Sequence, residues 1–313
     1  MSIDQLVNLD AKFFEATLHD KLDIELKERI NKKGFTVRYA NREEEQYCIK
    51  AAIESLISES LEKAGSHRLN KWEDGWSENL VELISSNTKT ALVPKYWGKN
   101  KYSRLNKNFI IGNGTNLIEP YDNEILGIIM YWLFGKYISP KNIQNVYEFG
   151  CGTGQHLIKA AEVNNQANIY GLDWAQSSQE IINNLNNNRI NGMNFDFFSP
   201  DYKITLGEKS AVYTVTSLEQ IGENYKDFVD YLLINKPEIC FHVEPIAELL
   251  DENNLIDYLS IKYFEKRNYL KGFLTYLEGL EACGKIEILQ KQRTMFGNMF
   301  VDGWSVIAWR CKP

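Results

Sequence analysis

From residue 145 onward, short apolar runs alternate with segments of helical periodicity. The apolar runs lie at 146–149, 168–172, 194–198, 211–215 and 239–243. The clearest helical segments lie between them, at 155–163, 178–188 and 225–234. Short apolar runs are typical of strands buried on both faces, and their alternation with helices is typical of βαβ units. The pattern predicts a parallel sheet covered by helices on both faces.

Two more strand-like runs follow at the C-terminal end, at 285–290 and 304–310, separated by Gly297 and Gly303. They are predicted to be antiparallel strands that close the sheet. The expected fold class is therefore α/β. It has a doubly wound, mostly parallel seven-stranded sheet with an antiparallel C-terminal strand, and a mainly helical N-terminal extension.

The N-terminal pattern is mainly helical to about residue 90. Four apolar residues are predicted to share one helix face: Ile53, Leu56, Ile57 and Leu61. Residues 94–121 are rich in Lys, Asn, Gly and aromatic residues and are predicted to be loop and connector. We expect a helical region over 1–119, a possible lid or acceptor-binding part, and a Rossmann-like catalytic domain over 120–313.

Composition excludes several classes of protein. The 313 residues are 44% hydrophobic and 25% charged, as in ordinary globular proteins. A net charge of −7 disfavours binding to nucleic acid backbones. The longest apolar stretch, 125–135, is too short to cross a bilayer, and the first ten residues lack the pattern of a secretory signal. The five Cys form no CxxC pair and there are only four His, so we expect a cytoplasmic protein with no metal site. The short apolar stretch predicts that the membrane is not a partner.

The most specific stretch is VYEFGCGTGQHL, at 146–157. Strand residues lead into Gly150, Gly152 and Gly154, and a helix follows. Glycines let the backbone turn sharply and approach a ligand closely, and the helix N-terminus offers free N–H groups. A dinucleotide site would have the spacing G-x-G-x-x-G. Here the spacing is G-x-G-x-G with Glu148 before it, which suits a ligand carrying an amino group better than a pyrophosphate.

This stretch resembles motif I of the class I S-adenosylmethionine (SAM)-dependent methyltransferases. The resemblance covers about residues 120–313. Asp173, in YGLDW, ends the second apolar run, where a carboxylate can accept both ribose hydroxyls. The resemblance implies that Asp196, in NFDFF at the end of the third run, contacts the adenine amino group beside an apolar neighbour. It also places residues after the fourth run under the methionine part of SAM. The cofactor-binding residues that we expect are Glu148, Gly150, Gly152, Gly154, Asp173, Trp174, Asp196, Phe197 and Thr216.

The acceptor is expected where the fourth and fifth runs end. Glu219 follows the fourth run, and Glu244 ends the fifth, with His242 on the same face by strand alternation. Ligands of open α/β sheets lie outside the carboxyl ends of the strands. Glu219, Glu244 and His242 are therefore the candidate catalytic residues. Two alternatives stay open: Glu244 as a structural cap, and His242 as a hydrogen-bonded core histidine.

The N-terminal part contains Trp72, Trp76 and Trp97 near polar residues. They could form an acceptor wall or lid, but packing onto the catalytic domain is the favoured interpretation. The combination of WEDGW, LVPKY, EFGCGTG, GLDW, SLEQ and VEP is similar to a bacterial group of sugar O-methyltransferases.

The hypothesis is a SAM-dependent methyltransferase for a small polar acceptor with a sugar-like hydroxyl. Rate would come from proximity and exclusion of water, with a carboxylate or His242 taking a proton. The alternatives are a non-catalytic SAM-binding or interaction module, and a methyltransferase for a protein or other macromolecule. The glycine spacing disfavours an NAD(P)-dependent oxidoreductase. The run 216–219 replaces the Asn/Asp-Pro-Pro-aromatic signature of base N-methylation and disfavours that activity. The oligomeric state is not predicted.

Overall fold

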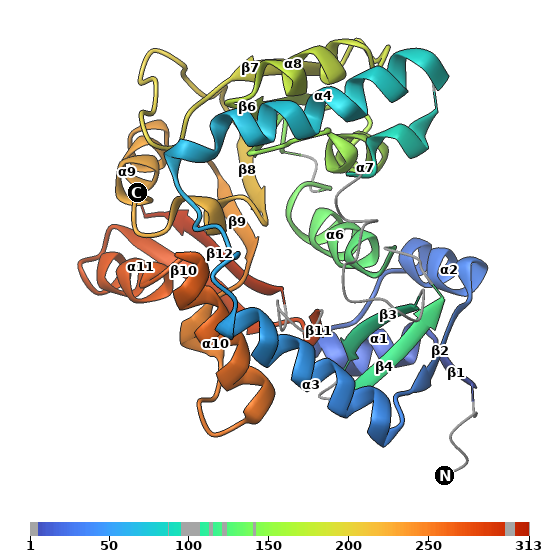
Figure 1. Cartoon of the computed structure of the whole chain (residues 1–313). Helices are drawn as coiled ribbons and strands as arrows, with labels where there is room; N and C mark the ends of the chain where they lie inside the picture. Colours follow the sequence, from blue (N-terminus) through green and yellow to red (C-terminus); the bar gives the residue numbers. More distant parts are fainter. Residues whose placement is uncertain are drawn as a thin grey trace.

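The computed structural model describes residues 6–86, 88–94, 107–112, 115–120, 124–139, 142–297 and 304–312. A seven-stranded sheet in the order β10-β12-β9-β8-β5-β6-β7 forms its centre (Figure 1). The parallel strands are β5 (Asn145–Phe149), β6 (Asn168–Asp173), β7 (Ile190–Asn194), β8 (Ser210–Val215) and β9 (Ile239–Glu244). The last strand, β12 (Ser305–Cys311), runs antiparallel to both β9 and β10 (Ile286–Arg293). The predicted fold class is confirmed.

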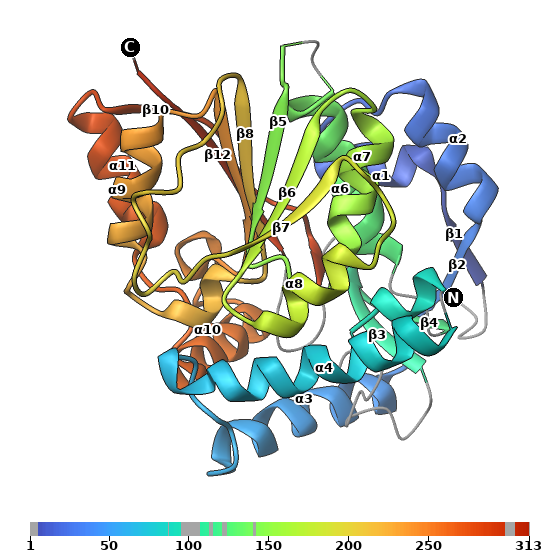
Figure 2. The same cartoon turned by 90° about the horizontal axis from the view of Figure 1, so that it is seen from above.

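Helices cover both faces of this sheet, as Figure 2 shows. One face carries α6 (Glu124–Tyr137), α7 (Gln155–Val163) and α8 (Gln176–Asn183), and the other carries α9 (Lys226–Asn235) and α11 (Phe273–Ala282). Successive strand residues point to opposite faces. Val146 therefore packs in the cluster with α6 and α7, and the next residue, Tyr147, packs in the cluster with α9 and α11. Burial on both faces explains why these strands are apolar throughout.

The predicted third strand, 194–198, is wrong. The strand is β7, Ile190–Asn194, and the aromatic residues follow it. As an edge strand, β7 has one partner among the described strands, β6, and needs fewer apolar residues. Phe195 is buried instead in a loop, with its ring centroid 4.7 Å from that of Phe149. The apolar run thus marks core packing beyond the strand.

The N-terminal extension is helical, as predicted, and contains α1 (Ala11–Leu18), α2 (Ile24–Lys33), α3 (Arg42–Ile57) and α4 (Leu69–Ser86). The predicted apolar face of α3 is wrong, because Ile53 and Ile57 are exposed. The small residues Cys48 and Ala52 are buried instead, against Leu259 of α10 (Leu255–Arg267). Small side chains let the two helices approach closely.

A second sheet, in the order β1-β2-β4-β3-β11, was not predicted. It consists of β1 (Leu6–Leu9), β2 (Phe35–Tyr39), β3 (Lys107–Gly112), β4 (Thr115–Pro120) and β11 (Phe296–Gly297). The prediction of loop and connector is therefore wrong at 107–112 and 115–120. β3 and β4 pair with each other as neighbours along the chain, whereas the pairing of β4 with β2 and of β3 with β11 joins segments far apart in the sequence. The second sheet combines β1 to β4 with β11 from the C-terminal part. The predicted division into two domains at residue 119 therefore stays a prediction.

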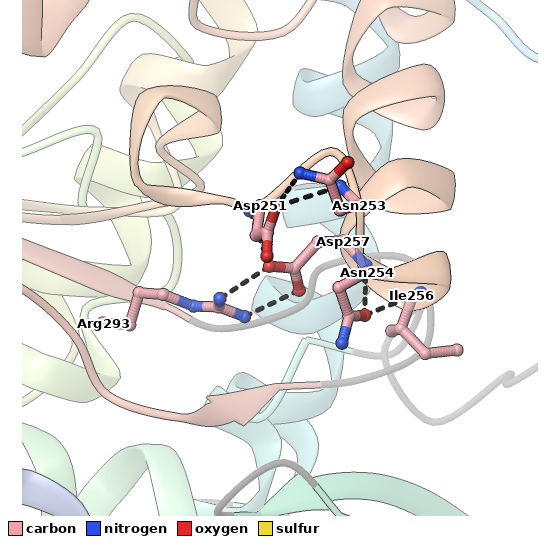
Figure 3. Close-up of polar contacts among 6 residues, drawn as sticks. All are labelled: Asp251, Asn253, Asn254, Ile256, Asp257 and Arg293. Atoms are coloured by element: carbon pink, nitrogen blue, oxygen red, sulfur yellow. Dashed lines mark hydrogen bonds and ion pairs between the residues drawn. The ribbon is translucent and has the colours of Figure 1, made fainter.

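The chain passes from the first sheet to the second just after Arg293. The Arg293 guanidinium donates two hydrogen bonds to the Asp257 carboxylate of α10, of 2.6 and 2.8 Å (Figure 3). The same carboxylate accepts a hydrogen bond from the backbone N–H of Asp251, while Asn254 caps the N-terminus of α10. This cluster fixes the point where β10 ends.

The remaining elements are short 3-10 helices: η1 (Ser66–Arg68), η2 (Lys89–Leu92), η3 (Leu218–Ile221) and η4 (Ala247–Leu249). Within the described ranges, no helix combines the length and apolar character needed to span a membrane.

Candidate functional site

A pocket lies where β5, β6 and β8 end, with about 760 Å³ of empty space including its open mouth. Its wall combines the glycine turn after β5, the start of α7, the loops after β6, β7 and β8, and the N-terminal part. The lining residues are Trp72, Trp76, Pro94, Glu148, Gly150, Cys151, Gly152, Thr153, Gln155, His156, Asp173, Trp174, Phe195, Phe197, Phe198, Val215, Thr216, Ser217, Gln220 and Ile221.

Seven of the predicted cofactor-binding residues therefore meet in one wall: Glu148, Gly150, Gly152, Asp173, Trp174, Phe197 and Thr216. Gly154 and Asp196 do not line it, and neither do the three predicted catalytic residues, Glu219, His242 and Glu244.

The glycine turn requires residues without a side chain. Gly150 and Gly152 have φ of +72° and +52°, in the left-handed region that side chains disfavour. A Cβ on Gly152 would lie 2.9 Å from Cζ2 of Trp76, and a Cβ on Gly150 would overlap Ser217. Gly154, also with positive φ, caps α7 instead of facing the pocket. The turn is thus closely covered by its neighbours.

Asp173 ties the turn to the neighbouring strand. Its Oδ2 accepts a hydrogen bond from the backbone N–H of Gly152, and Oδ1 accepts one from Ala175, both at 2.9 Å. Burial raises the pKa of Asp173 to about 6, against the opposing effect of these N–H groups. The predicted acidic residue is therefore at the pocket, and it also has a structural role.

Glu148 is the most buried carboxyl of the wall, with 1% of its surface exposed. Burial raises its pKa to about 8, although the Tyr213 hydroxyl donates to Oε2 at 3.0 Å and Lys159 favours the charged form. A cationic group entering the pocket would stabilise the carboxylate and lower this pKa. The position suits an amino group of a ligand.

Aromatic residues surround the part of the pocket next to β6 and β7. The Trp174 and Phe198 rings stack with centroids 5.8 Å apart, and Phe197 lines the wall beside them. Asp196, between strand and pocket, accepts a hydrogen bond from the backbone N–H of Phe198 at 2.8 Å. It therefore shapes the loop that presents the two phenylalanines, and its contact with an adenine amino group stays a prediction.

The loop after β8 brings Thr216, with φ +48°, and Gln220 to the pocket. Glu219 points elsewhere, with Oε1 accepting from the Gln220 side chain at 2.8 Å. The carboxyl faces Tyr269 and Arg267, and its buried Oε2 makes no hydrogen bond of normal geometry within the described part of the chain. Burial, and then Glu244, raise the pKa of Glu219 to about 8.

Glu244 is a structural cap, one of the alternatives considered above. Its carboxylate accepts hydrogen bonds from the backbone N–H groups of Ser217, Leu218 and Glu219, at 3.1–3.2 Å. Burial raises its pKa to about 7 despite these donors. A catalytic role is not supported, because the side chain holds the loop and does not line the pocket.

His242 is a core histidine. Thr214 Oγ1 lies 3.0 Å from Nδ1, and the Trp309 indole N–H donates to Nε2 at 3.0 Å. Complete burial lowers the pKa of His242 to about 3. Both ring nitrogens are thus occupied, which fits the alternative of a hydrogen-bonded core histidine, and the role in proton transfer stays a prediction. Strand alternation gives the face of a residue but not what covers it, which here is Trp309 of β12.

Trp72 and Trp76 of α4 form a roof over the glycine turn. Their rings stack with centroids 5.4 Å apart, and both line the pocket. The favoured interpretation of packing is confirmed for Trp76, which packs with Ala175 and Ile181 of the α8 region. Packing and pocket lining are both roles of this helix, because α4 packs against the catalytic part and also forms one wall of the pocket. Trp97 lies outside the described residues.

The roof is held from both ends. The Glu73 carboxylate accepts a hydrogen bond from the backbone N–H of Ser177 at 2.9 Å. Asn79 donates to the carbonyls of Ala91 and Val93, and Thr153 donates to the carbonyl of Leu92. These bonds fix α4 and the segment ending at Pro94 against the sheet edge.

Sequence reasoning did not select Gln155 and His156, although both line the pocket. The signal was available, because they directly follow Gly154 in the first turn of α7. Among the residues that the structure describes, no three His, Cys, Asp or Glu side chains are grouped to hold a metal ion.

No protein-family model and no curated protein matches the sequence. Solved structures of several methyltransferases are similar in fold. The plantazolicin methyltransferase BpumL in complex with SAH (S-adenosyl-L-homocysteine) shares 12% identity with this chain. The match covers 78% of this chain and 98% of that chain, with a TM-score of 0.45. The magnesium protoporphyrin IX methyltransferase from Synechocystis PCC 6803 with bound SAH shares 18% identity, covering 60% and 83%, with a TM-score of 0.44.

The N-methyltransferase NodS from Bradyrhizobium japonicum WM9, in complex with S-adenosyl-L-homocysteine (SAH), shares 10% identity. It covers 61% of this chain and 90% of that chain, with a TM-score of 0.47. At these identities and TM-scores the likeness says nothing about the chemistry of the pocket.

Proposed function

We propose that this chain is a SAM-dependent methyltransferase for a small polar acceptor with a sugar-like hydroxyl. The observation that carries the proposal is the meeting of Glu148, Gly152 and Asp173 in one pocket at the carboxyl edge of a doubly wound sheet. This edge is where such sheets bind ligands. An acidic, glycine-turned wall suits a ligand with an amino group and a ribose.

Each part of SAM has a counterpart in this wall. The Glu148 carboxylate would pair with the amino group of the methionine part, beside the open backbone of the turn. Each oxygen of Asp173 already accepts one N–H, but a carboxylate oxygen has a second lone pair for a ribose hydroxyl. Trp174 and Phe197 would hold the adenine ring by their aromatic faces.

The polar residues of the wall that are not assigned to SAM favour a neutral, polar acceptor. Gln155, Ser217 and Gln220 line the pocket together with the Trp72 ring. Neutral amides and hydroxyls can bind the hydroxyl groups of an acceptor, while an indole face packs on its apolar side. The roof of α4 over the glycine turn favours an acceptor small enough to fit beneath it.

The residues would act mainly by positioning. When bound, SAM supplies an electrophilic methyl group on a sulfonium. Glu148 would fix the amino group of the cofactor and Asp173 its ribose, on either side of the sulfonium, so that the acceptor beneath the roof meets the methyl in line. Proximity and exclusion of water by Trp72 and Trp76 would supply most of the rate enhancement.

Calorimetry with SAM, SAH and NAD⁺ tests the cofactor. We expect SAM and SAH to bind, and Glu148→Gln to weaken both while leaving the fold intact. Binding of NAD⁺ without SAM would overturn the proposal and favour an oxidoreductase.

Transfer of a labelled methyl group from SAM to a panel of glycosides, phenols, amines, a peptide mixture and RNA tests the acceptor. Label in a glycoside or other small hydroxyl compound supports the proposal. Label only in peptide or RNA would favour a methyltransferase for macromolecules. SAM binding without transfer to any of them would favour a non-catalytic module.

A further inference from the structure

Methyl transfer to a hydroxyl requires a proton acceptor, which the three predicted residues do not supply. The acceptor oxygen forms a bond to the methyl carbon as the bond from carbon to sulfur breaks, and the hydroxyl proton must leave. Glu219, His242 and Glu244 do not line the pocket. A side chain that receives this proton therefore belongs to another residue of the wall.

Three side chains of the wall are able to accept a proton: Glu148, Asp173 and His156. Glu148 accepts from Tyr213, and the oxygens of Asp173 hold the backbone of the glycine turn and of Ala175. Both carboxyls are also needed to hold the cofactor in the function proposed above. His156 is different, because its Nδ1 is buried and has no hydrogen-bond partner in the described ranges of the chain.

We propose that His156 is the catalytic residue that takes the proton of the acceptor hydroxyl. This inference rests on the proposed function and assigns a role within the same pocket. His156 is the second residue of α7, directly after the glycine turn, and the residue is 6% exposed. Its Nε2 lies 3.5 Å from the side-chain amide of Gln155, another residue of the wall. In the tautomer that carries its proton on Nε2, with the Gln155 amide oxygen turned toward it, Nδ1 is the nitrogen that can take a proton. A buried polar nitrogen without a partner is costly, and a bound acceptor would supply that partner.

The surroundings of His156 keep the ring neutral and able to accept a proton. Burial and the nearby Lys159 ammonium lower its pKa well below the ordinary value. The carboxyls of Glu148 on β5 and Asp173 on β6 lie in the same pocket wall. Without a ligand, a charged imidazolium is disfavoured here.

Charge balance makes proton transfer feasible in such a site. SAM brings one positive charge on sulfur, and SAH leaves without it. When the acceptor oxygen takes the methyl group and His156 takes the proton, the positive charge moves from sulfur to the imidazole. The net charge of the buried site is unchanged in this step, and the proton then passes to water as the pocket opens.

The SAM analogue sinefungin tests this placement without a known acceptor. Sinefungin carries a protonated amine in place of the sulfonium methyl, and SAH carries nothing there. We expect the amine to donate to His156 directly or through one water. His156→Ala should then lower the affinity for sinefungin by about tenfold relative to SAH, as measured by calorimetry. His156→Gln should lose less, because its amide oxygen can still accept.

The controls separate this inference from the proposed function. His67, which is exposed and outside the pocket, provides the matched variant His67→Gln, which should bind both ligands as the wild type does. SAH binding within about twofold of the wild type shows that a variant is folded. An unchanged ratio of sinefungin to SAH affinity in His156→Ala would overturn the role of His156 alone. Failure of the wild type to bind any of these ligands would overturn the proposed function, and this inference with it.

Discussion

The Asp173 carboxylate accepts a hydrogen bond from the backbone N–H of Gly152 at 2.9 Å, so the end of β6 holds the glycine turn that follows β5. The other oxygen orders the start of α8 through Ala175. One side chain thus fixes the relative positions of two loops of the pocket. Its second lone pairs remain able to accept from a ligand.

Asp173→Ala should therefore reduce both stability and cofactor affinity. Loss of two hydrogen bonds to buried N–H groups should lower the free energy of unfolding of the ligand-free protein by about 1–3 kcal/mol. SAM affinity should fall at least about tenfold. Denaturant unfolding and calorimetry measure the two effects separately.

Asp201→Ala is the matched control for this variant. The exposed Asp201 also accepts a backbone N–H two residues ahead, from Lys203 at 2.9 Å, but it is not in the pocket wall. Its loss should leave SAM affinity unchanged. Normal SAM affinity in folded Asp173→Ala would limit Asp173 to its structural role.

The pocket wall around the glycine turn could be predicted because its signals are local in sequence. Gly150, Gly152 and Glu148 lie within a few residues of each other, and the end of a parallel strand fixes where they meet. Trp174 and Phe197 follow the next strands in the same way. For each of these residues, the side chain and the backbone turn that positions it lie within one short stretch of sequence or at the end of one strand.

The acceptor half could not be predicted because its partners are distant in sequence. Strand alternation placed His242 and Glu244 on one face, but β12 brings Trp309 to His242, and the loop after β8 brings three N–H groups to Glu244. In the second sheet this reason applies to the pairing of β3 with β11 and of β4 with β2, whereas the pairing of β3 with β4 is local and was missed.

Arg293→Met should strongly destabilise the fold. The Asp257 carboxyl is 4% exposed and would lose its bidentate partner where β10 ends, shown in Figure 3. Leaving one charge of a buried pair without its partner costs about 3–5 kcal/mol of the free energy of unfolding, measured by denaturant titration.

The control for Arg293 is Arg310→Met, on neighbouring β12. Arg310 also bonds a carboxylate, Glu287 at 2.7 Å, but both side chains are about half exposed. Solvent-exposed pairs contribute about 0–1 kcal/mol. Equal losses in the two variants would contradict a special role of the Arg293–Asp257 pair.

Gly152→Ala should destabilise the turn through two separate causes. Alanine disfavours φ of +52°, and its Cβ would press on the Trp76 ring at 2.9 Å. Trp76→Leu in the same chain should relieve the second cause only. The double variant should thus be about 1 kcal/mol more stable than the sum of the single effects predicts.

Gly75→Ala is the control for the Gly152 variant. Gly75 lies in α4, and a Cβ there meets no atom within 4 Å. Alanine should stabilise this helix by about 0.5–1 kcal/mol. If the effects of Gly152→Ala and Trp76→Leu were additive, the Cβ added at position 152 would not press on the Trp76 ring.

Glu219→Gln should flatten the dependence of stability on pH. The pKa of Glu219 is raised from 4.5 to about 8, first by burial and then by Glu244. A carboxyl with a raised pKa in the folded protein contributes stability that is complete below about pH 4.5 and is lost as pH rises to about 8. The free energy of unfolding of the wild type should therefore decrease across this range, with Glu148 and Glu244 acting in the same direction.

The variant removes one of these titrating groups while its amide oxygen can still accept the hydrogen bond from Gln220. Glu219→Gln should be more stable than the wild type at pH 8, and the difference should vanish near pH 4.5. Glu223→Gln changes an exposed carboxylate that pairs with Lys271 at 3.1 Å, and it should keep the slope of the wild type. If urea titrations between pH 4.5 and 8 gave the same slope for Glu219→Gln and the wild type, Glu219 would not be a buried, titrating carboxyl. Its buried Oε2 would then have to reach water or a ligand, which would return Glu219 to the candidates for acceptor chemistry.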